Sequence, residues 1–101
     1  MMKRHELKTW PTYFGATLNG VKDFDIRKDD RAFDVGDFLI LIEFDQRMGE
    51  FTGRVMERRI DSIVYGGPMV TGKPGIPDPT GGLREGFVIL GHSYVNPGYG
   101  G

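Results

Sequence analysis

The chain has 101 residues, of which 39% are hydrophobic and 27% charged, with a formal net charge of −1 and no cysteine. This length and composition are those of one small folded domain, and they exclude a wholly disordered chain. The near-neutral charge argues against strong non-specific binding of duplex DNA, and the lack of cysteine excludes disulfides, thiolate zinc sites and cysteine nucleophiles.

The N-terminal segment predicts a strand followed by a helix. In "KRHELKT" (residues 3–9), His5 and Leu7 fall on one face of a strand. Pro11 suits a first helical turn and Gly20 a helix stop. A stripe of 3.6-residue period lies between these signals: Trp10, Tyr13, Phe14, Thr17 and Leu18. Such a stripe is more often core than a surface on which bases stack, so we expect these side chains to be buried.

The stretch "GVKDFDIRKDDR" (residues 20–31) has eight charged residues out of twelve. Phe24 and Ile26 alternate with Asp25 and Arg27, which predicts a half-buried strand anchored by its apolar side chains and directing its charges the other way. We expect "KDDR" to form a turn. The main candidate site is a mixed cluster of charges: Lys8, Lys22, Arg27, Lys28, Arg31 and Arg54 with Glu6, Asp25, Asp29 and Asp30. The alternative is a set of solvated ion pairs contributing about 0–1 kcal/mol each.

The rest of the chain predicts a small barrel. Residues 38–42 are five consecutive apolar residues, typical of a strand buried on both faces, which favours a closed or nearly closed barrel covered by a helix. A long strand should follow in residues 52–66, with Met56, Ile60 and Val64 sharing one face. Ten of the seventeen residues 66–82 are Gly or Pro, which predicts a mobile loop.

The domain is expected to end with a final strand in residues 84–95. Residues 1–95 should therefore form one domain, with residues 96–101 as a flexible tail.

Two further residues are candidates for a ligand site. His5 is either a ligand contact or a satisfied, semi-buried side chain. Gly53 in "FTGR" allows close backbone approach, so Arg54 either reaches a groove or simply enters a strand after a turn. With two histidines and no cysteine, no metal site is predicted, and no motif points to a cofactor.

The sequence resembles the ASCH domains of the PUA-like superfamily, in particular a subgroup of small bacterial and bacteriophage proteins. The most specific match is Gly20, Lys22, Asp25 and Arg27 followed by "GD" at residues 36–37; "HELKTWPTYF", "FTGR" and "GFVILG" also match. The subgroup usually has Glu at the position of Asp25 and Asn at that of Asp29. The resemblance implies a PUA-like barrel of five to six strands, with one N-terminal helix at its mouth. It also implies a cleft for RNA or nucleotide-like ligands between that helix and the strand bearing the motif.

One ASCH branch contains amidohydrolases that remove the acyl group from N4-acetylcytidine. These enzymes use a Lys, a Thr three residues later and a distant Glu. Lys22 matches the Lys, but Asp25 stands at the Thr position, so an enzyme built on this chain would rely on Lys22 and Asp25 as catalytic residues.

The favoured hypothesis is a cytoplasmic binding module for RNA or a nucleotide, modified or not. No apolar run could span a membrane, and no signal peptide is visible. The expected ligand-binding residues come from several segments: His5, Lys8, Trp10, Lys22, Asp25, Arg27, Arg31 and Arg54. The first alternative is an amidohydrolase acting on N4-acylated cytidines, and the second is a phage accessory module that contacts a protein through residues 66–82. The oligomeric state is left open.

Overall fold

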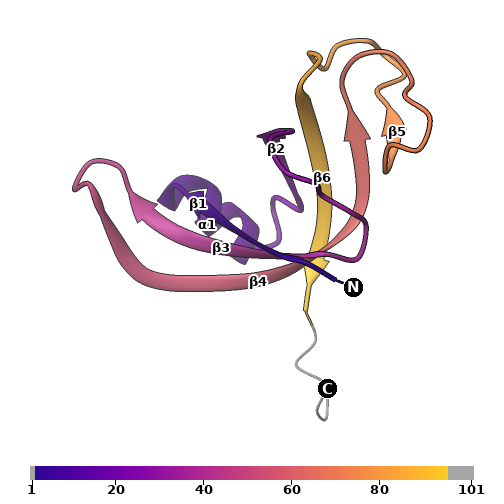
Figure 1. The fold of residues 1–101 in the computed structure, drawn as a ribbon. Helices are drawn as coiled ribbons and strands as arrows, with labels where there is room; N and C mark the ends of the chain where they lie inside the picture. The colour runs from indigo at the N-terminus through magenta and orange to yellow at the C-terminus, as the bar shows by residue number, and fades with distance from the viewer. Residues whose placement is uncertain (1, 96–101) are drawn as a thin grey trace.

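Six strands and one helix make up residues 2–95, the part of the chain that the computed structural model describes. The strands are β1 (Arg4–Thr9), β2 (Phe24–Lys28), β3 (Phe38–Asp45), β4 (Glu50–Tyr65), β5 (Ile76–Pro77) and β6 (Phe87–Tyr94), and the helix is α1 (Pro11–Leu18). They form one sheet of order β1-β3-β4-β6-β2, with β5 added to β4. Figure 1 shows this sheet curled into a half-barrel with α1 beside it. The predicted small, mainly β fold with one N-terminal helix is confirmed. No helix in residues 2–95 is long and apolar enough to cross a membrane.

Strand β3 lies inside the sheet, between β1 and β4, and is buried on both faces as the run of apolar residues predicted. It pairs in parallel with β1 and antiparallel with β4. Leu39, Ile40 and Leu41 are all buried although consecutive residues point to opposite faces, so β3 is covered on both sides. Leu39 and Leu41 belong to the main core, together with Ile60 of β4 and Leu90 of β6.

Strand β4 is long enough to serve two neighbours, pairing first with β3 and then with β6. The pairing with β6 shifts register between Ile60 and Ser62. An extra residue in one strand reverses the inward and outward faces beyond it. Ile63 and Tyr65 are therefore buried, and the prediction that Val64 shares the inner face of Met56 and Ile60 is wrong.

The helical stripe is mostly exposed, which corrects the expectation of a buried one. Phe14 and Thr17 are buried, but Trp10 is 49% exposed, Tyr13 48% and Leu18 55%. The reason is geometric: α1 has only eight residues and packs chiefly against one strand, β3, so only the narrow face that points at the sheet is covered. Trp10 is the N-cap, outside the helix itself.

Strand β2 presents the opposite face to that predicted. Asp25 is only 5% exposed, whereas Phe24 and Ile26 are 40% and 56% exposed. Alternation shows which residues share a face but not which face turns inward. Here the Asp25 carboxylate turns inward, toward His92 of β6 and the neighbouring Arg58 of β4. The apolar side chains of Phe24 and Ile26 turn to the surface.

Residues 66–82 contain the two-residue strand β5, which pairs in parallel with the end of β4. Gly75 precedes β5 with a φ of 88°, and a Cβ there would collide with the carbonyl oxygen of Ile63. Gly72, in the same loop, has a φ of 82° but no atom within 4 Å of such a Cβ.

Gly75→Ala is therefore expected to lower the free energy of unfolding by about 1 kcal/mol or more beyond the loss caused by Gly72→Ala. Both variants bear the strain of a positive φ, and only the first adds a backbone clash. Urea denaturation of the two proteins measures the difference. Equal losses of stability in the two variants would contradict the close approach of Gly75 to the Ile63 carbonyl oxygen.

Candidate functional site

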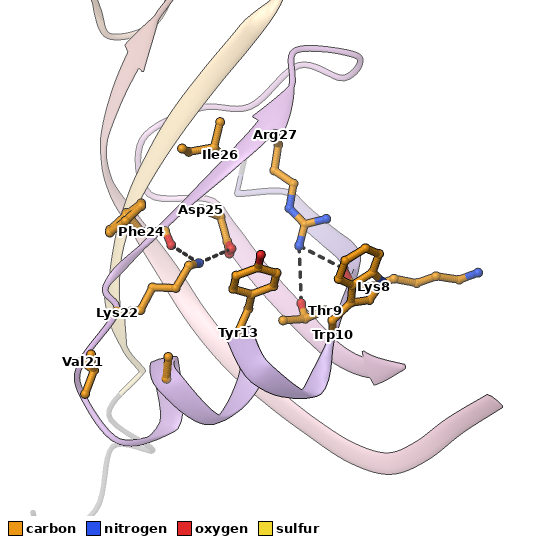
Figure 2. Close-up of a pocket in the computed structure, with 11 residues that line it drawn as sticks. Lys8, Thr9, Trp10, Tyr13, Val21, Lys22, Phe24, Asp25, Ile26 and Arg27 are labelled. Atoms are coloured by element: carbon orange, nitrogen blue, oxygen red, sulfur yellow. Dashed lines mark hydrogen bonds and ion pairs between the residues drawn. The ribbon is translucent and has the colours of Figure 1, made fainter. Parts of the chain in front are cut away.

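A pocket of about 810 Å³ lies between α1 and β2, next to the end of β1. This volume is typical of sites for a single small ligand. Five of the eight expected ligand-binding residues line it: Lys8, Trp10, Lys22, Asp25 and Arg27. Figure 2 shows side chains from α1, β2 and the connection between them facing one another across this space. The structure thus brings together the motif residues Lys22, Asp25 and Arg27.

Arg54 lies elsewhere. Its Nε and Nη2 donate to the two carboxylate oxygens of Glu43 at 2.9 and 3.0 Å, and its guanidinium lies 4.9 Å from the ring centroid of Phe14. It lines a different groove, of about 640 Å³, with Phe14 and Leu18. Arg54 therefore does not converge with Lys22 and Arg27, and its strong partner is a carboxylate of the neighbouring strand.

His5 and Arg31 also lie outside the pocket. His5 is buried, with Nε2 2.8 Å from Oδ2 of Asp37, the acidic residue of the motif's trailing "GD". Arg31 donates from Nη1 to the carbonyl oxygen of Glu6. Both side chains support the strands: His5 fixes β1 to the turn before β3, and Arg31 joins the turn after β2 to β1.

The floor of the pocket is a buried chain of polar groups. Lys22 Nζ donates to the carbonyl oxygen of Phe24 and, at 2.7 Å, to Oδ1 of Asp25. On the inner side, Asp25 Oδ2 lies 3.3 Å from His92 Nε2, poorly aligned for a hydrogen bond, and neither atom has another partner among residues 2–95. Arg58 Nε donates to His92 Nδ1 at 2.9 Å, and Arg58 Nη2 donates to the His92 carbonyl oxygen.

The contact with Arg58 fixes the tautomer of His92. Arg58 can only donate, so His92 Nδ1 must accept, and the proton of the neutral ring sits on Nε2. That proton points toward Asp25 Oδ2. The carboxylate is thus held between Lys22 on the pocket side and His92 on the core side.

Burial alone would raise the pKa of the Asp25 carboxyl group. Contacts from His92 and Lys22, with the positive charges of Lys22 and Arg27, outweigh that effect and bring the pKa below its ordinary value of 3.8. Asp25 is therefore ionised at neutral pH and weakly basic. Its charge compensates that of Lys22.

Arg27 is held by neutral groups. Its Nη2 donates to the carbonyl oxygen of Lys8 at 3.0 Å and to Thr9 Oγ1 at 3.4 Å (Figure 2). These bonds join β2 to β1, the two edges of the curled sheet, across the pocket. Within residues 2–95 Arg27 makes no ion pair with a carboxylate, so its charge is free to attract an anion.

Three aromatic side chains stand at the pocket with large exposed surfaces. Trp10 and Tyr13 are stacked, with ring centroids 6.2 Å apart and 24° between their planes, and Phe24 also lines the pocket, from β2. Lys22 Nζ lies 5.8 Å from the ring centroid of Tyr13 and 5.1 Å from that of Phe24. The pocket therefore combines flat apolar faces with cations, which suits a planar, anionic ligand.

Tyr13, His92 and Arg58 were missed as site residues. Tyr13 was weighed as a stacking residue and assigned to the core; its neighbour Trp10 and the shortness of the helix were the available signals. His92 and Arg58 lie 67 and 33 residues from Asp25 in the sequence, and no local pattern connects them. Only the pairing of β6 with both β2 and β4 brings them together.

Asp37 is a second buried carboxylate, and its role is structural. It accepts hydrogen bonds from the backbone N–H groups of Lys3 and Asp34, both at 3.0 Å, besides its contact with His5. Burial raises its pKa, but these bonds and the charge of Lys3 lower it below 3.8 overall.

Stability is therefore expected to fall in acid. In the unfolded chain Asp25 and Asp37 have ordinary pKa values near 3.8, and in the folded protein both pKa values are lower. The stability they contribute is fully present above 3.8 and is lost as the pH falls through the folded-state values. Urea denaturation from neutral pH down to about pH 3 should show this loss, and it should be shallower in Asp25→Asn. If stability falls with pH as steeply in Asp25→Asn as in the unmodified protein, the lowered pKa of Asp25 is contradicted.

Among residues 2–95, no cluster of three or more His, Asp or Glu side chains could hold a metal ion. The polar side chains of the pocket are instead three basic ones, a carboxylate already paired, and the hydroxyls of Thr9 and Tyr13. This set suits binding of an organic anion by hydrogen bonds and charge.

Comparison with known proteins places the whole pocket inside one family match. The family model described as "Domain of unknown function (DUF3850)" matches residues 4–92. The chain is also 46% identical over 63 residues to the "Uncharacterized 12.9 kDa protein in GpA 3'region" of Escherichia phage P2, covering 62% of this chain and 56% of that protein. The chain thus spans just over half of that relative's length. The expected likeness to a phage protein is confirmed, whereas the assignment to the ASCH domains stays a prediction.

Proposed function

The chain belongs to the DUF3850 family, and we propose that its pocket between α1 and β2 binds a single-stranded RNA segment or a nucleotide, modified or not. One observation supports this proposal above all: exposed aromatic side chains line the same pocket as Lys22 and Arg27. The family description itself assigns no activity, and the geometry of the pocket supports the proposal.

The exposed aromatics support a ligand with a planar ring. Trp10 and Tyr13 are about half exposed at the pocket, where a nucleobase could cover apolar surface that water now contacts. Stacking of a base on an aromatic side chain contributes about 1–3 kcal/mol. A nucleobase is thus a better match to these faces than a flexible aliphatic ligand.

The charges support an anionic group attached to that ring. A guanidinium group gives a phosphate strong, charge-assisted hydrogen bonds, and Arg27 lies beside the aromatics with no carboxylate partner in the described part of the chain. The net charge of −1 for the whole chain fits a local site better than general attraction to nucleic acid.

We also propose that this domain is an ASCH domain of the PUA-like superfamily. The motif residues Lys22, Asp25 and Arg27 border a pocket between the helix and the strand that carries them, where the resemblance places a ligand cleft. The curled sheet of six strands is compatible with such a barrel.

The amidohydrolase hypothesis has weaker support. Its favourable feature is Lys22 beside Asp25 in the pocket. However, Asp25 is buried and its pKa is lowered, so it is a poor general base at neutral pH. Incubation with N4-acetylcytidine tests this hypothesis: release of cytidine that disappears in Lys22→Ala would establish it in place of simple binding.

The binding proposal is tested by amide NMR titration with nucleosides, nucleoside monophosphates and short single-stranded RNA. We expect shifts in residues 20–31 and in α1, because these line the pocket. The amide signals of residues 53–57, which line the other groove, should not shift and serve as an internal control. If none of these ligands shifts the pocket residues at millimolar concentration, the proposed function is wrong.

A further inference from the structure

The positive charge available to a ligand in this pocket is smaller than its three basic residues suggest. Lys22 Nζ lies 2.7 Å from Asp25 Oδ1, and the side chains of Lys22 and Asp25 are only 16% and 6% exposed. Since the carboxyl group of Asp25 has a lowered pKa, it is ionised at neutral pH and cancels the charge of Lys22. The pair is therefore neutral as a unit.

Lys8 lines the pocket with its backbone and stem rather than with its ammonium. Its Nζ lies 4.5 Å from the ring centroid of Phe44 and 5.7 Å from that of Phe51, residues outside the pocket. Figure 2 shows this side chain extending away from the space enclosed by Tyr13, Lys22 and Arg27. Arg27 is left as the one uncompensated cation of the pocket among the described residues.

The donors of Arg27 are divided between the fold and the pocket. Nη2 is occupied by the Lys8 carbonyl oxygen and Thr9 Oγ1, which holds the guanidinium plane in place. Within residues 2–95, Nε and Nη1 have no hydrogen-bond partner. Because both paired edges of a guanidinium include Nη2, Arg27 can give a phosphate a single charge-assisted hydrogen bond from Nη1 or Nε, which suits one phosphate group.

Lys22 can donate one hydrogen bond to a ligand. Two of its three N–H bonds point to the Phe24 carbonyl oxygen and to Asp25, so one donor remains. It lies beside the faces of Tyr13 and Phe24, where a stacked base would present its edge. A neutral ion pair with one free N–H can donate to a ring nitrogen or carbonyl oxygen of a base and add no net charge.

We propose that the pocket takes one nucleotide unit with a single phosphate, which Arg27 binds, while Lys22 donates to the edge of the base stacked beside Tyr13. The inference rests on the proposed function and specifies its ligand. The unit is either a free nucleoside monophosphate or one residue of a strand, since both present one base and one phosphate.

Calorimetric titration tests this assignment by comparing a nucleoside, its 5′-monophosphate, its 5′-triphosphate and a trinucleotide with the same base in the middle. The monophosphate should bind about 10- to 100-fold more tightly than the nucleoside, as one hydrogen-bonded charge pair allows. The triphosphate should bind less than about threefold more tightly than the monophosphate. The slope of log K against log salt for the monophosphate should be shallow, because only one phosphate group is neutralised.

Arg27→Met should abolish the preference for monophosphate over nucleoside and leave nucleoside affinity within about threefold. Arg54→Met is the matched control, because that arginine lies in the other groove, and it should change neither value. Since Arg27 also joins β2 to β1, Arg27→Lys is the second variant: it keeps a cation and should retain part of the preference.

The outcomes separate this inference from the proposed function. A triphosphate or trinucleotide that binds 100-fold more tightly, with a salt slope several times steeper, would overturn the single-phosphate assignment and leave nucleotide binding intact. Absence of binding by all four ligands would overturn both. Equal affinities for the monophosphate and the trinucleotide would support a unit within a strand, and preference for the monophosphate a free nucleotide.

Discussion

Asp25→Ala is expected to lower the free energy of unfolding by about 3–5 kcal/mol, the cost of removing one partner from a buried ion pair. The change would leave Lys22 without its carboxylate and His92 Nε2 facing an empty space at the base of the pocket. It would also remove a negative charge that favours the buried, positively charged Arg58. Denaturation in urea at neutral pH measures the loss.

Asp30→Ala is the matched control for this variant. Asp30 lies in the turn after β2, and within the described part of the chain its side chain forms one ion pair, with the exposed Arg31 at 3.5 Å. Its removal should change stability by no more than about 1 kcal/mol. If Asp25→Ala and Asp30→Ala cost the same, the buried chain from Lys22 to Arg58 does not hold the pocket floor.

Tyr13→Ala is expected to weaken nucleotide binding by about 1–3 kcal/mol, or roughly 5- to 150-fold, because a base would lose its stacking surface. Stability should change little, since Tyr13 is 48% exposed and lines the pocket instead of the core. Calorimetric titration with a nucleoside monophosphate measures the affinity. Tyr13→Phe should retain most of it, because the flat ring is kept.

Tyr94→Ala is the control for this loss of an aromatic ring. Tyr94 is 69% exposed and lines the groove that contains Arg54. It should leave the affinity unchanged. Equal effects of the two substitutions would place the ligand outside the pocket between α1 and β2.

Sequence patterns predicted the elements of the fold better than their orientation. The apolar run of residues 38–42 correctly indicated a strand buried on both faces, and Pro11 and Gly20 correctly bracketed the helix. Alternation in β2 did not reveal that Asp25 points inward, because the two faces of a strand are equivalent until neighbours are known. The bulge after Ile60 was equally invisible, since one extra residue leaves no mark in the composition.

The candidate site shows the same division. Lys22, Asp25 and Arg27, which the motif of the resemblance grouped, line one pocket with Trp10 and Lys8, and their role in binding a ligand stays a prediction. Arg54 was misplaced because Glu43, its partner, comes from the pairing of β3 with β4. Contacts between residues distant in sequence decide which charges are free: among residues 2–95, Arg27 is the one cation of the pocket without a carboxylate partner.

Titration of Trp10 fluorescence with a nucleoside monophosphate tests the central claim most directly. Trp10 is the only tryptophan of the chain and lies at the pocket with 49% of its surface exposed. A stacked base should quench its emission in a saturable way, with a midpoint that Tyr13→Ala moves to higher concentration and Tyr94→Ala does not. Free tryptophan amide corrects for absorption by the ligand. If the corrected emission shows no saturable quenching up to millimolar ligand, nucleotide binding in the pocket is contradicted.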